Sequence, residues 1–317
     1  MKFSPLKFGN VTVQTPIIQG GMAVKISTAP LAAAVANEGG IGLIGASGMS
    51  TEELRREIRL AKQLAPHGIV GVNIMVAASA FIDLVKVAIE EKIDLIAAGA
   101  GFSRDVFALG RAAGIPVAPI VSSAKVAKLA EKLGASFIIV EGKVAAGHLG
   151  TDRAMIEIVP EVVEAVNLPV IAAGGIIDGK DIAEALKLGA AGVQMGTRFV
   201  ASKESNAADS FKQFYLMAEH EDVVTIKSPV GYPGRSLKNP FSIKALADES
   251  ERPKTCQGCL KECSRSFCLI NALIRAQQGD VETGLVFTGE NVGRIKEILS
   301  VKEIFQRLLT ELEQCEA

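Results

Sequence analysis

The amino-acid sequence predicts an α/β protein, a (β/α)8 TIM barrel with a small, mostly helical domain formed by the later part of the chain. Short apolar runs alternate with helical periodicity eight times, at a mean spacing of about 25 residues, which is the length of one βα unit. Several of these runs are uninterrupted, as expected for parallel strands buried on both faces. A chain of 317 residues also has room for a barrel of about 250 residues and an appendage.

The eight strands are expected near residues 17–19, 41–44, 70–73, 95–98, 117–120, 137–140, 170–173 and 191–194. Helical patterns fill the segments between them, for example at 51–64 and 123–133, and serine or threonine caps open these helices. The amphipathic segment 301–312 is expected to pack on the barrel or on a second subunit. We expect residues 1–217 and 283–317 to form the barrel and residues 218–282 to form the small domain, which we call the cap.

The functional residues of such a barrel lie on the loops that follow the strands. Small residues recur at nearly every exit, so a flat, rigid group could lie against the backbone there. The expected cofactor-binding residues are Gln19, Gly20, Gly21, Met22, Asn73, Ala98, Gly99, Glu141, Gly147, Ala173, Gly174, Gly175, Gln194, Met195, Gly196 and Thr197.

The last two strand exits predict a phosphate site. Gly174 and Gly175 follow the seventh strand and Gly196 follows the eighth, each at the mouth of a helix, where free backbone N–H groups and the helix dipole favour an anion. The amide side chains of Gln19, Asn73 and Gln194 could hydrogen-bond the edge of a heteroaromatic ring. A phosphate site beside a ring slot suggests flavin mononucleotide (FMN); the alternative is that the glycines only ease tight turns.

The motifs QGGMA, GVNIM, AGAG, EGxxAxGH, PVIAAGGI and QMGTRFVASKESNA occur in this order and spacing. Together with GRSLKNPF and TGENVG they resemble the nitronate monooxygenase (2-nitropropane dioxygenase) and enoyl-acyl carrier protein reductase II family, over almost the whole chain. The resemblance implies FMN on a (β/α)8 barrel. It assigns the flavin ring to Gly21, Met22, Asn73 and Gln194, and the phosphate to Gly174, Gly175, Gly196 and Thr197.

His148 is the candidate catalytic residue. It follows the sixth strand between two glycines, where an imidazole could move a proton to or from a carbon beside the flavin, and the resemblance places the family's catalytic histidine here. The alternative is a loop histidine that only hydrogen-bonds backbone. Arg198 and Arg235 are candidates for the phosphate of a nicotinamide cofactor or a pantetheine carrier, against ordinary salt bridges, and Tyr232 is a weaker candidate proton donor.

Cys256, Cys259, Cys263 and Cys268 form the pattern C-x2-C-x3-C-x4-C within the cap. We predict that these four thiols bind a [4Fe-4S] cluster, with zinc as a less favoured alternative and reduced structural thiols as a third. Enoyl-acyl carrier protein reductases II carry no such motif as the resemblance describes them, so the motif is a departure from the family. A cluster there would either pass single electrons to the flavin or stabilise a small domain that has little core of its own.

The composition excludes several classes of function. Hydrophobic residues make up 49% of the chain, which excludes a disordered protein. The formal charge is −1, so there is no excess of basic residues to bind nucleic acid. We find no signal peptide or membrane span, so we expect a cytoplasmic protein that does not bind membranes. A homodimer is expected, with acyl carrier protein or an electron-transfer protein as further possible partners.

The leading hypothesis is NAD(P)H-dependent reduction of an enoyl thioester by an FMN enzyme. Oxidation of nitronates or nitroalkanes with FMN and oxygen is the first alternative, and a flavin-binding redox sensor without turnover is the second. Chemistry like that of IMP dehydrogenase would need a nucleophilic cysteine on a barrel loop, and no cysteine precedes Cys256.

Overall fold

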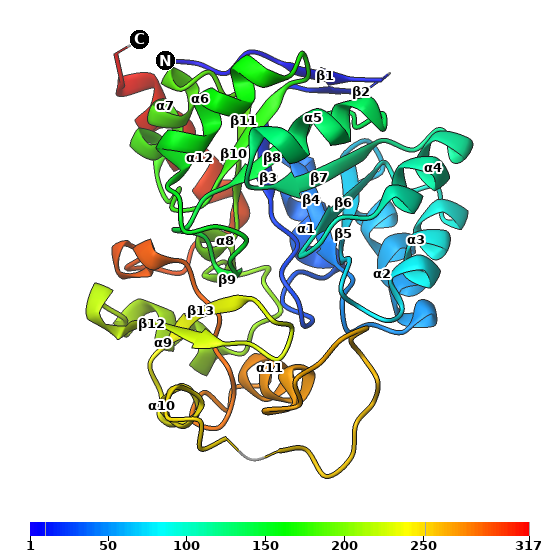
Figure 1. Ribbon diagram of the computed structural model, residues 1–317. Helices are drawn as coiled ribbons and strands as arrows, with labels where there is room; N and C mark the ends of the chain where they lie inside the picture. Colours follow the sequence, from blue (N-terminus) through cyan, green and yellow to red (C-terminus); the bar gives the residue numbers. More distant parts are fainter. Residues whose placement is uncertain (10, 251, 317) are drawn as a thin grey trace.

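The computed structural model describes residues 1–9, 11–250 and 252–316, and the predicted barrel is confirmed (Figure 1). Eight parallel strands close in the order β10-β11-β3-β4-β5-β6-β7-β8. All eight predicted strands are present: β3 (Ile17–Gln19), β4 (Ile41–Gly45), β5 (Ile69–Met75), β6 (Leu95–Gly99), β7 (Val117–Val121), β8 (Ile138–Glu141), β10 (Val170–Ala173) and β11 (Gly192–Met195).

Helices cover the outside of the barrel. They are α1 (Ala29–Asn37), α2 (Thr51–Leu64), α3 (Phe81–Glu90), α4 (Arg104–Ala113), α5 (Ala124–Lys132), α6 (Met155–Ala165), α7 (Gly179–Lys187), α8 (Thr197–Val200) and α12 (Val301–Gln314). The predicted serine caps are seen at α2 and α5, where the hydroxyls of Ser50 and Ser123 accept from backbone N–H groups in the first turn. The C-terminal helix α12 packs between α7 and α1, on the barrel as predicted.

The barrel has two layers of apolar core. Residues that point outward from the strands pack under the helices, and residues that point inward fill the barrel. A hairpin that was not predicted, β1 (Leu6–Phe8) with β2 (Val11–Val13), closes the amino-terminal end of the barrel. Phe8 of this hairpin packs on Phe137, with ring centroids 5.0 Å apart. The cap covers the other end of the barrel, at the carboxyl ends of the strands.

The cap lies at the opposite end of the barrel from this hairpin (Figure 1). The cap contains η1 (His220–Asp222), β12 (Val223–Lys227), β13 (Pro233–Leu237), α10 (Pro240–Leu246) and α11 (Leu269–Gln277). In the sequence, α9 (Asp209–Met217) precedes it and η2 (Glu290–Arg294) follows it. The two strands form an antiparallel pair, and a two-residue strand of the barrel loop, β9 (Gly147–His148), adds to β13. The cap therefore shares a sheet with the barrel, which the prediction of a mostly helical domain did not include.

Every helix in the described residues is too short or too polar to cross a membrane.

Candidate active site

A cavity of about 250 Å³ lies at the carboxyl end of the barrel, between the strand exits and the cap. From the cap side it is lined by Leu269, Ile270 and Leu273 of α11 and by Phe287. From the barrel it is lined by most of the predicted residues: Gly20, Gly21, Met22, Asn73, Gly99, Glu141, Gly147, His148, Ala173, Gly174, Gly175, Gln194, Met195, Gly196 and Thr197. The other two, Gln19 and Ala98, are buried in the barrel and do not line it.

The strand register explains why Gln19 and Ala98 do not reach the cavity. Successive side chains of a strand point to opposite faces. Gln194 is level with the inward-pointing Ile18, whereas Gln19 is one residue further and level with Met195, which points outward. Ala98 likewise belongs to the outward layer.

The side chain of Gln19 is used by the barrel itself. Its Oε1 accepts from the backbone N–H of Leu43 at 3.2 Å, and its Nε2 donates to the carbonyl oxygens of Leu43 (3.3 Å) and Gly20. The amide therefore has no free group for a cofactor, and the structure does not support the predicted role of Gln19 at the ring edge.

The amide of Gln194, unlike that of Gln19, has an oxygen that the barrel does not use. Its Oε1 is buried and has no hydrogen-bond partner in the described chain. An unsatisfied buried acceptor costs about 1–3 kcal/mol, so it marks a place where a ligand N–H would bind. Asn73 lies on the same inward face, and its Nδ2 donates to the carbonyl of Gly21 at 3.0 Å.

Gly21 is required by close packing. A Cβ at this position would lie 2.3 Å from the Cβ of Asn73, a separation that real side chains do not adopt. The exits of β3 and β5 therefore approach each other closely only because residue 21 has no side chain.

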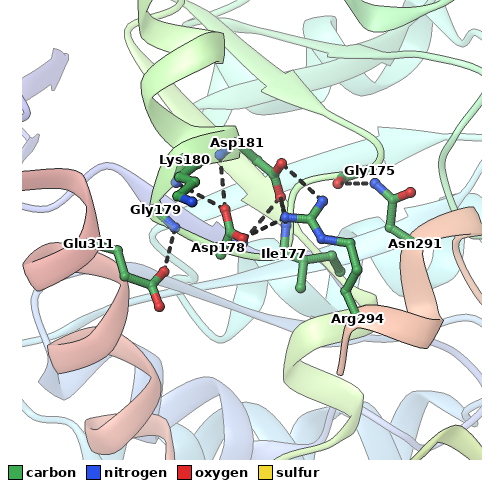
Figure 2. Close-up of polar contacts among 9 residues, drawn as sticks. All are labelled: Gly175, Ile177, Asp178, Gly179, Lys180, Asp181, Asn291, Arg294 and Glu311. Carbon is green, nitrogen blue, oxygen red and sulfur yellow. Dashed lines mark hydrogen bonds and ion pairs between the residues drawn. The ribbon is translucent and has the colours of Figure 1, made fainter. Parts of the chain in front are cut away.

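The first turn of α7 is closed to a ligand (Figure 2). Asp178, the N-cap residue, accepts from the backbone N–H of Asp181 at 3.1 Å, and Glu311 of α12 accepts from the N–H of Gly179 at 2.8 Å. Arg294 forms ion pairs with the carboxylates of Asp178 and Asp181. Because these groups satisfy the helix terminus, an anion would have to bind elsewhere.

Free backbone donors lie in the turns just before the two helices. Gly175, Ile176 and Gly196 line the cavity, and their backbone N–H groups have no acceptor in the described chain. Gly175 has a φ of +85°, which favours glycine, and Asn291 fixes the turn by donating to the carbonyl of Gly175 at 2.6 Å (Figure 2). These donors suit a phosphate at the ends of β10 and β11, where the sequence predicts one.

His148 lies on the rim of the cavity, fixed by the cap. It pairs with Gly234 of β13, and its Nε2 is 2.8 Å from the hydroxyl oxygen of Ser228. The imidazole packs edge-on against Phe287, with ring centroids 5.2 Å apart. Burial lowers the pKa of His148 to about 4, so its imidazole is neutral near pH 7.

Glu141 ends β8 and points inward, level with Ala173 of β10. Burial raises the pKa of Glu141 to about 7. Its side chain lines the first cavity and also a second cavity of about 250 Å³, which includes Tyr232. Tyr232 is thus near the site, on the side of the second cavity.

The two candidate arginines serve the scaffold. The guanidinium of Arg198 is buried and donates to two backbone carbonyl oxygens at 2.7 and 2.8 Å. Arg235 donates to the carbonyl of Ala145 at 2.9 Å and pairs with Glu290 at 3.0 Å, which braces the loop that carries His148. Neither lines the cavity, so the structure favours the alternative, a structural role, over the phosphate contacts for which both arginines were candidates.

The four cap cysteines lie on a loop between α10 and α11 that is anchored to the barrel. The carbonyl of Cys259 accepts from the N–H of Ser79 at 3.0 Å, and Leu260 forms a β-bridge with Ala78. All four thiols, of Cys256, Cys259, Cys263 and Cys268, are free. In the described residues no three His, Cys, Asp or Glu side chains are placed to hold a metal ion, so the structure does not support the predicted cluster or its zinc alternative.

Several residues of the site were not found from the sequence. Ser228 lies in the turn between β12 and β13, where a serine gives no signal of contact with a distant histidine. Phe287 could have been suspected, because it directly precedes the quoted TGENVG motif. The apolar residues of α11 carry an ordinary helical pattern, which predicts packing but not a place above a cofactor.

Comparison with known proteins identifies the family and agrees with the barrel fold. The family model "Nitronate monooxygenase" matches residues 4–93 and 68–311. FabK from Thermotoga maritima is 38% identical, with a TM-score of 0.87, and the alignment covers 95% of this chain and 94% of FabK. Nitroalkane oxidase from Streptomyces ansochromogenes is 25% identical, with a TM-score of 0.81 and coverage of 95% and 96%.

Two kinds of curated relative are also similar. A protein of Rhodococcus jostii named (3aS,4S,5R,7aS)-5-hydroxy-7a-methyl-1-oxo-octahydro-1H-indene-4-carboxyl-CoA dehydrogenase is 29% identical, covering 95% of this chain and 93% of its own. A probable nitronate monooxygenase of Staphylococcus aureus (strain Newman) is 31% identical, covering 77% and 81%. Because the family model spans nearly the whole chain, the protein belongs to the nitronate monooxygenase family and is an oxidoreductase.

Proposed function

We propose that this protein is an FMN-dependent reductase that uses NAD(P)H to saturate the double bond of an enoyl thioester. The observation that carries the reductase assignment is the likeness to FabK, an enoyl-acyl carrier protein reductase II. This likeness exceeds that to nitroalkane oxidase in both identity and TM-score. The name of the Rhodococcus jostii relative includes a carboxyl-CoA, which supports a thioester substrate.

The residues of the cavity fit FMN. The buried Oε1 of Gln194 lacks a donor, and the imide N–H of an isoalloxazine ring could supply one. The unpaired N–H groups of Gly175, Ile176 and Gly196 would hold the phosphate. When bound, FMN supplies hydride transfer, which no side chain of the site can provide.

The chain's own residues would bind and orient the substrate. His148 is held by Ser228 and Phe287, so its neutral imidazole presents a fixed hydrogen-bonding edge to a carbonyl. The apolar side chains of Leu269 and Leu273 cover the cavity from the cap and would exclude water from the reacting carbons.

Anaerobic stopped-flow spectroscopy tests the proposal. The FMN-loaded protein is reduced with one equivalent of NAD(P)H and mixed with crotonyl thioester, while flavin absorbance is followed. We expect rapid reoxidation by the thioester. If the thioester does not reoxidise the reduced flavin, and a nitronate reduces the oxidised flavin without any nicotinamide, the reductase assignment is rejected.

Nitronate oxidation is the second candidate, and the neutral His148 favours it. A neutral imidazole can act as a base toward the acidic carbon of a nitroalkane, whereas a protonated one cannot. The same instrument distinguishes the two reactions, because a nitroalkane would reduce oxidised flavin without any nicotinamide. Membership of an oxidoreductase family makes the third hypothesis, a sensor without turnover, the least supported.

Metal binding by the four cap cysteines stays a separate proposal, supported by their spacing alone. No step of the reaction above depends on it. Iron, acid-labile sulfide and zinc should be measured in anaerobically purified protein and in a Cys259→Ser, Cys263→Ser variant. Wild-type protein without stoichiometric metal would reject the proposal.

A further inference from the structure

Glu141 lies where two cavities meet. Both cavities are lined by Ala100, Ile120, Glu141 and His148. The first extends toward the proposed FMN site, and the second extends past Phe102 to Tyr232, which is 37% exposed. A substrate that reaches the flavin site from the second cavity would pass directly by the Glu141 carboxyl.

No basic side chain is available to Glu141. Its carboxyl forms no hydrogen bond or ion pair within the described chain, and no lysine or arginine of that part lines either cavity. The other titratable groups that line the cavities are His148, Tyr215 and Tyr232. The phenol of Tyr215 is already used, because it donates to the carbonyl of Phe287. A carboxyl in this position is favoured in its protonated form, which agrees with its pKa of about 7.

His148 is poorly suited to donate a proton. With a pKa of about 4, roughly one imidazole in a thousand is protonated at pH 7. Its Nε2 also faces the hydroxyl of Ser228 at 2.8 Å. The residue that the sequence singles out as the acid-base group is therefore neutral and engaged, whereas Glu141 is free.

We propose that Glu141 is the proton donor of the reduction, and that His148 positions the thioester; this inference rests on the proposed function. The O–H bond of the Glu141 carboxyl breaks as a C–H bond forms at the α-carbon of the enoyl thioester. FMN, when bound, would supply the hydride for the C–H bond at the β-carbon, with NAD(P)H as the source of its two electrons. The Glu141 carboxylate then regains a proton from water in the second cavity.

The test compares wild-type protein with Glu141→Gln and with a matched control, Glu157→Gln. Glu157 lies on the exposed face of α6 and pairs with Arg153 at 3.3 Å, far from either cavity lining. Two quantities are measured: the single-turnover rate of flavin reoxidation by crotonyl thioester, and the C=O stretch of a protonated carboxyl by infrared difference spectroscopy. FMN titration of each variant reports whether the cofactor site is intact.

In E141Q we expect reoxidation to slow by about 10²–10⁴-fold, as is typical for loss of a general acid. The wild-type rate should fall as the pH rises through about 7, and this dependence should be absent in E141Q but present in E157Q. The infrared band should be present in wild-type protein at about pH 6 and lost in E141Q.

Two results separate the possible failures. If reduced wild-type protein is not reoxidised by the thioester, the proposed function fails and this inference fails with it. If wild type is reoxidised and E141Q reacts at the wild-type rate, or the infrared band is absent from wild type, only the role of Glu141 is overturned. The infrared measurement on wild-type protein applies even if E141Q does not fold.

Discussion

Replacing Gln194 by methionine should stabilise the cofactor-free protein and weaken its binding of FMN. The Oε1 of Gln194 is buried without a partner, which costs about 1–3 kcal/mol in the absence of a ligand. Methionine is similar in length and carries no such acceptor. The free energy of unfolding should therefore rise by about 1 kcal/mol or more, with an increase of about 2–4 °C in Tm. The Kd for FMN should increase by about 5–150-fold, because the same 1–3 kcal/mol is lost on binding.

Gln19→Met is the matched control with the opposite expectation. The Gln19 amide is fully buried and bonded to the backbone of Leu43, so its removal leaves those groups unsatisfied. We expect a loss of about 1–3 kcal/mol in unfolding free energy, with an unchanged FMN affinity for the folded protein. Thermal unfolding of flavin-free protein and fluorescence titration with FMN measure both effects. A Q194M protein that is no more stable than wild type and binds FMN equally well would refute the reasoning.

Four further predictions concern packing, the pH dependence of stability and the position of the histidine. Gly21→Ala should lower the free energy of unfolding by about 1–3 kcal/mol in urea titrations, because its Cβ would lie 2.3 Å from that of Asn73. Burial lowers the pKa of His148 from 6.5 to about 4, so the unfolded chain binds more protons than the folded chain between pH 6.5 and pH 4. Lowering the pH from 6.5 to about 4 should therefore reduce the free energy of unfolding by up to about 3 kcal/mol. His148→Asn should remove this loss. Burial raises the pKa of Glu141 from 4.5 to about 7, so the folded chain binds more protons than the unfolded chain between these two pH values. The stability that Glu141 contributes at low pH is therefore lost as the pH rises through about 7. E141Q should remove this pH dependence, which urea unfolding at several pH values would show. Ser228→Ala should slow flavin reoxidation by about 2–10-fold with unchanged FMN binding, because one hydrogen bond to His148 is lost, and a wild-type rate would contradict the positioning role.

The barrel could be predicted from the sequence because its signals are local and repeated. Each strand is a short apolar run, and each is followed by a helix with its own cap, as in α2, whose observed bounds Thr51–Leu64 equal the predicted ones. The closure of eight such units into a barrel follows from their number and spacing. The hairpin of β1 and β2 was missed because neither strand is an uninterrupted apolar run followed by a helix, so both fall outside the repeated βα pattern.

The sequence predicts which strand ends form the site, but not the direction in which each side chain points. Gln19 and Gln194 both occur at the end of an apolar strand and read alike in the sequence. Their strands are buried on both faces, so no alternation of polar and apolar residues reveals which face is which. Only the register, which sets Gln194 level with Ile18 and Gln19 level with Met195, shows that one amide faces the cavity and the other does not.

Contacts between distant segments were beyond sequence reasoning. The pairing of β9 with β13 joins His148 to Gly234, and the contact with Ser228 follows from that pairing. Neither segment carries a signal for the other. The cysteine spacing shows the same limit, because a pattern of thiols fixes their order along the chain but not whether three of them come together to hold a metal ion, and in the described residues no such group forms.

The two groups proposed to act on the substrate come from different parts of the fold. Glu141 is the last residue of a barrel strand and is held between β7 and β10, so its position is set by the barrel. His148 belongs to the sheet of the cap, through β13, and its hydrogen-bond partner lies in that sheet's turn. Any motion that lifts the cap from the barrel would move His148 with it and leave Glu141 in place. Productive geometry would then exist only when the cap is closed, which is also the state in which α11 covers the reacting carbons.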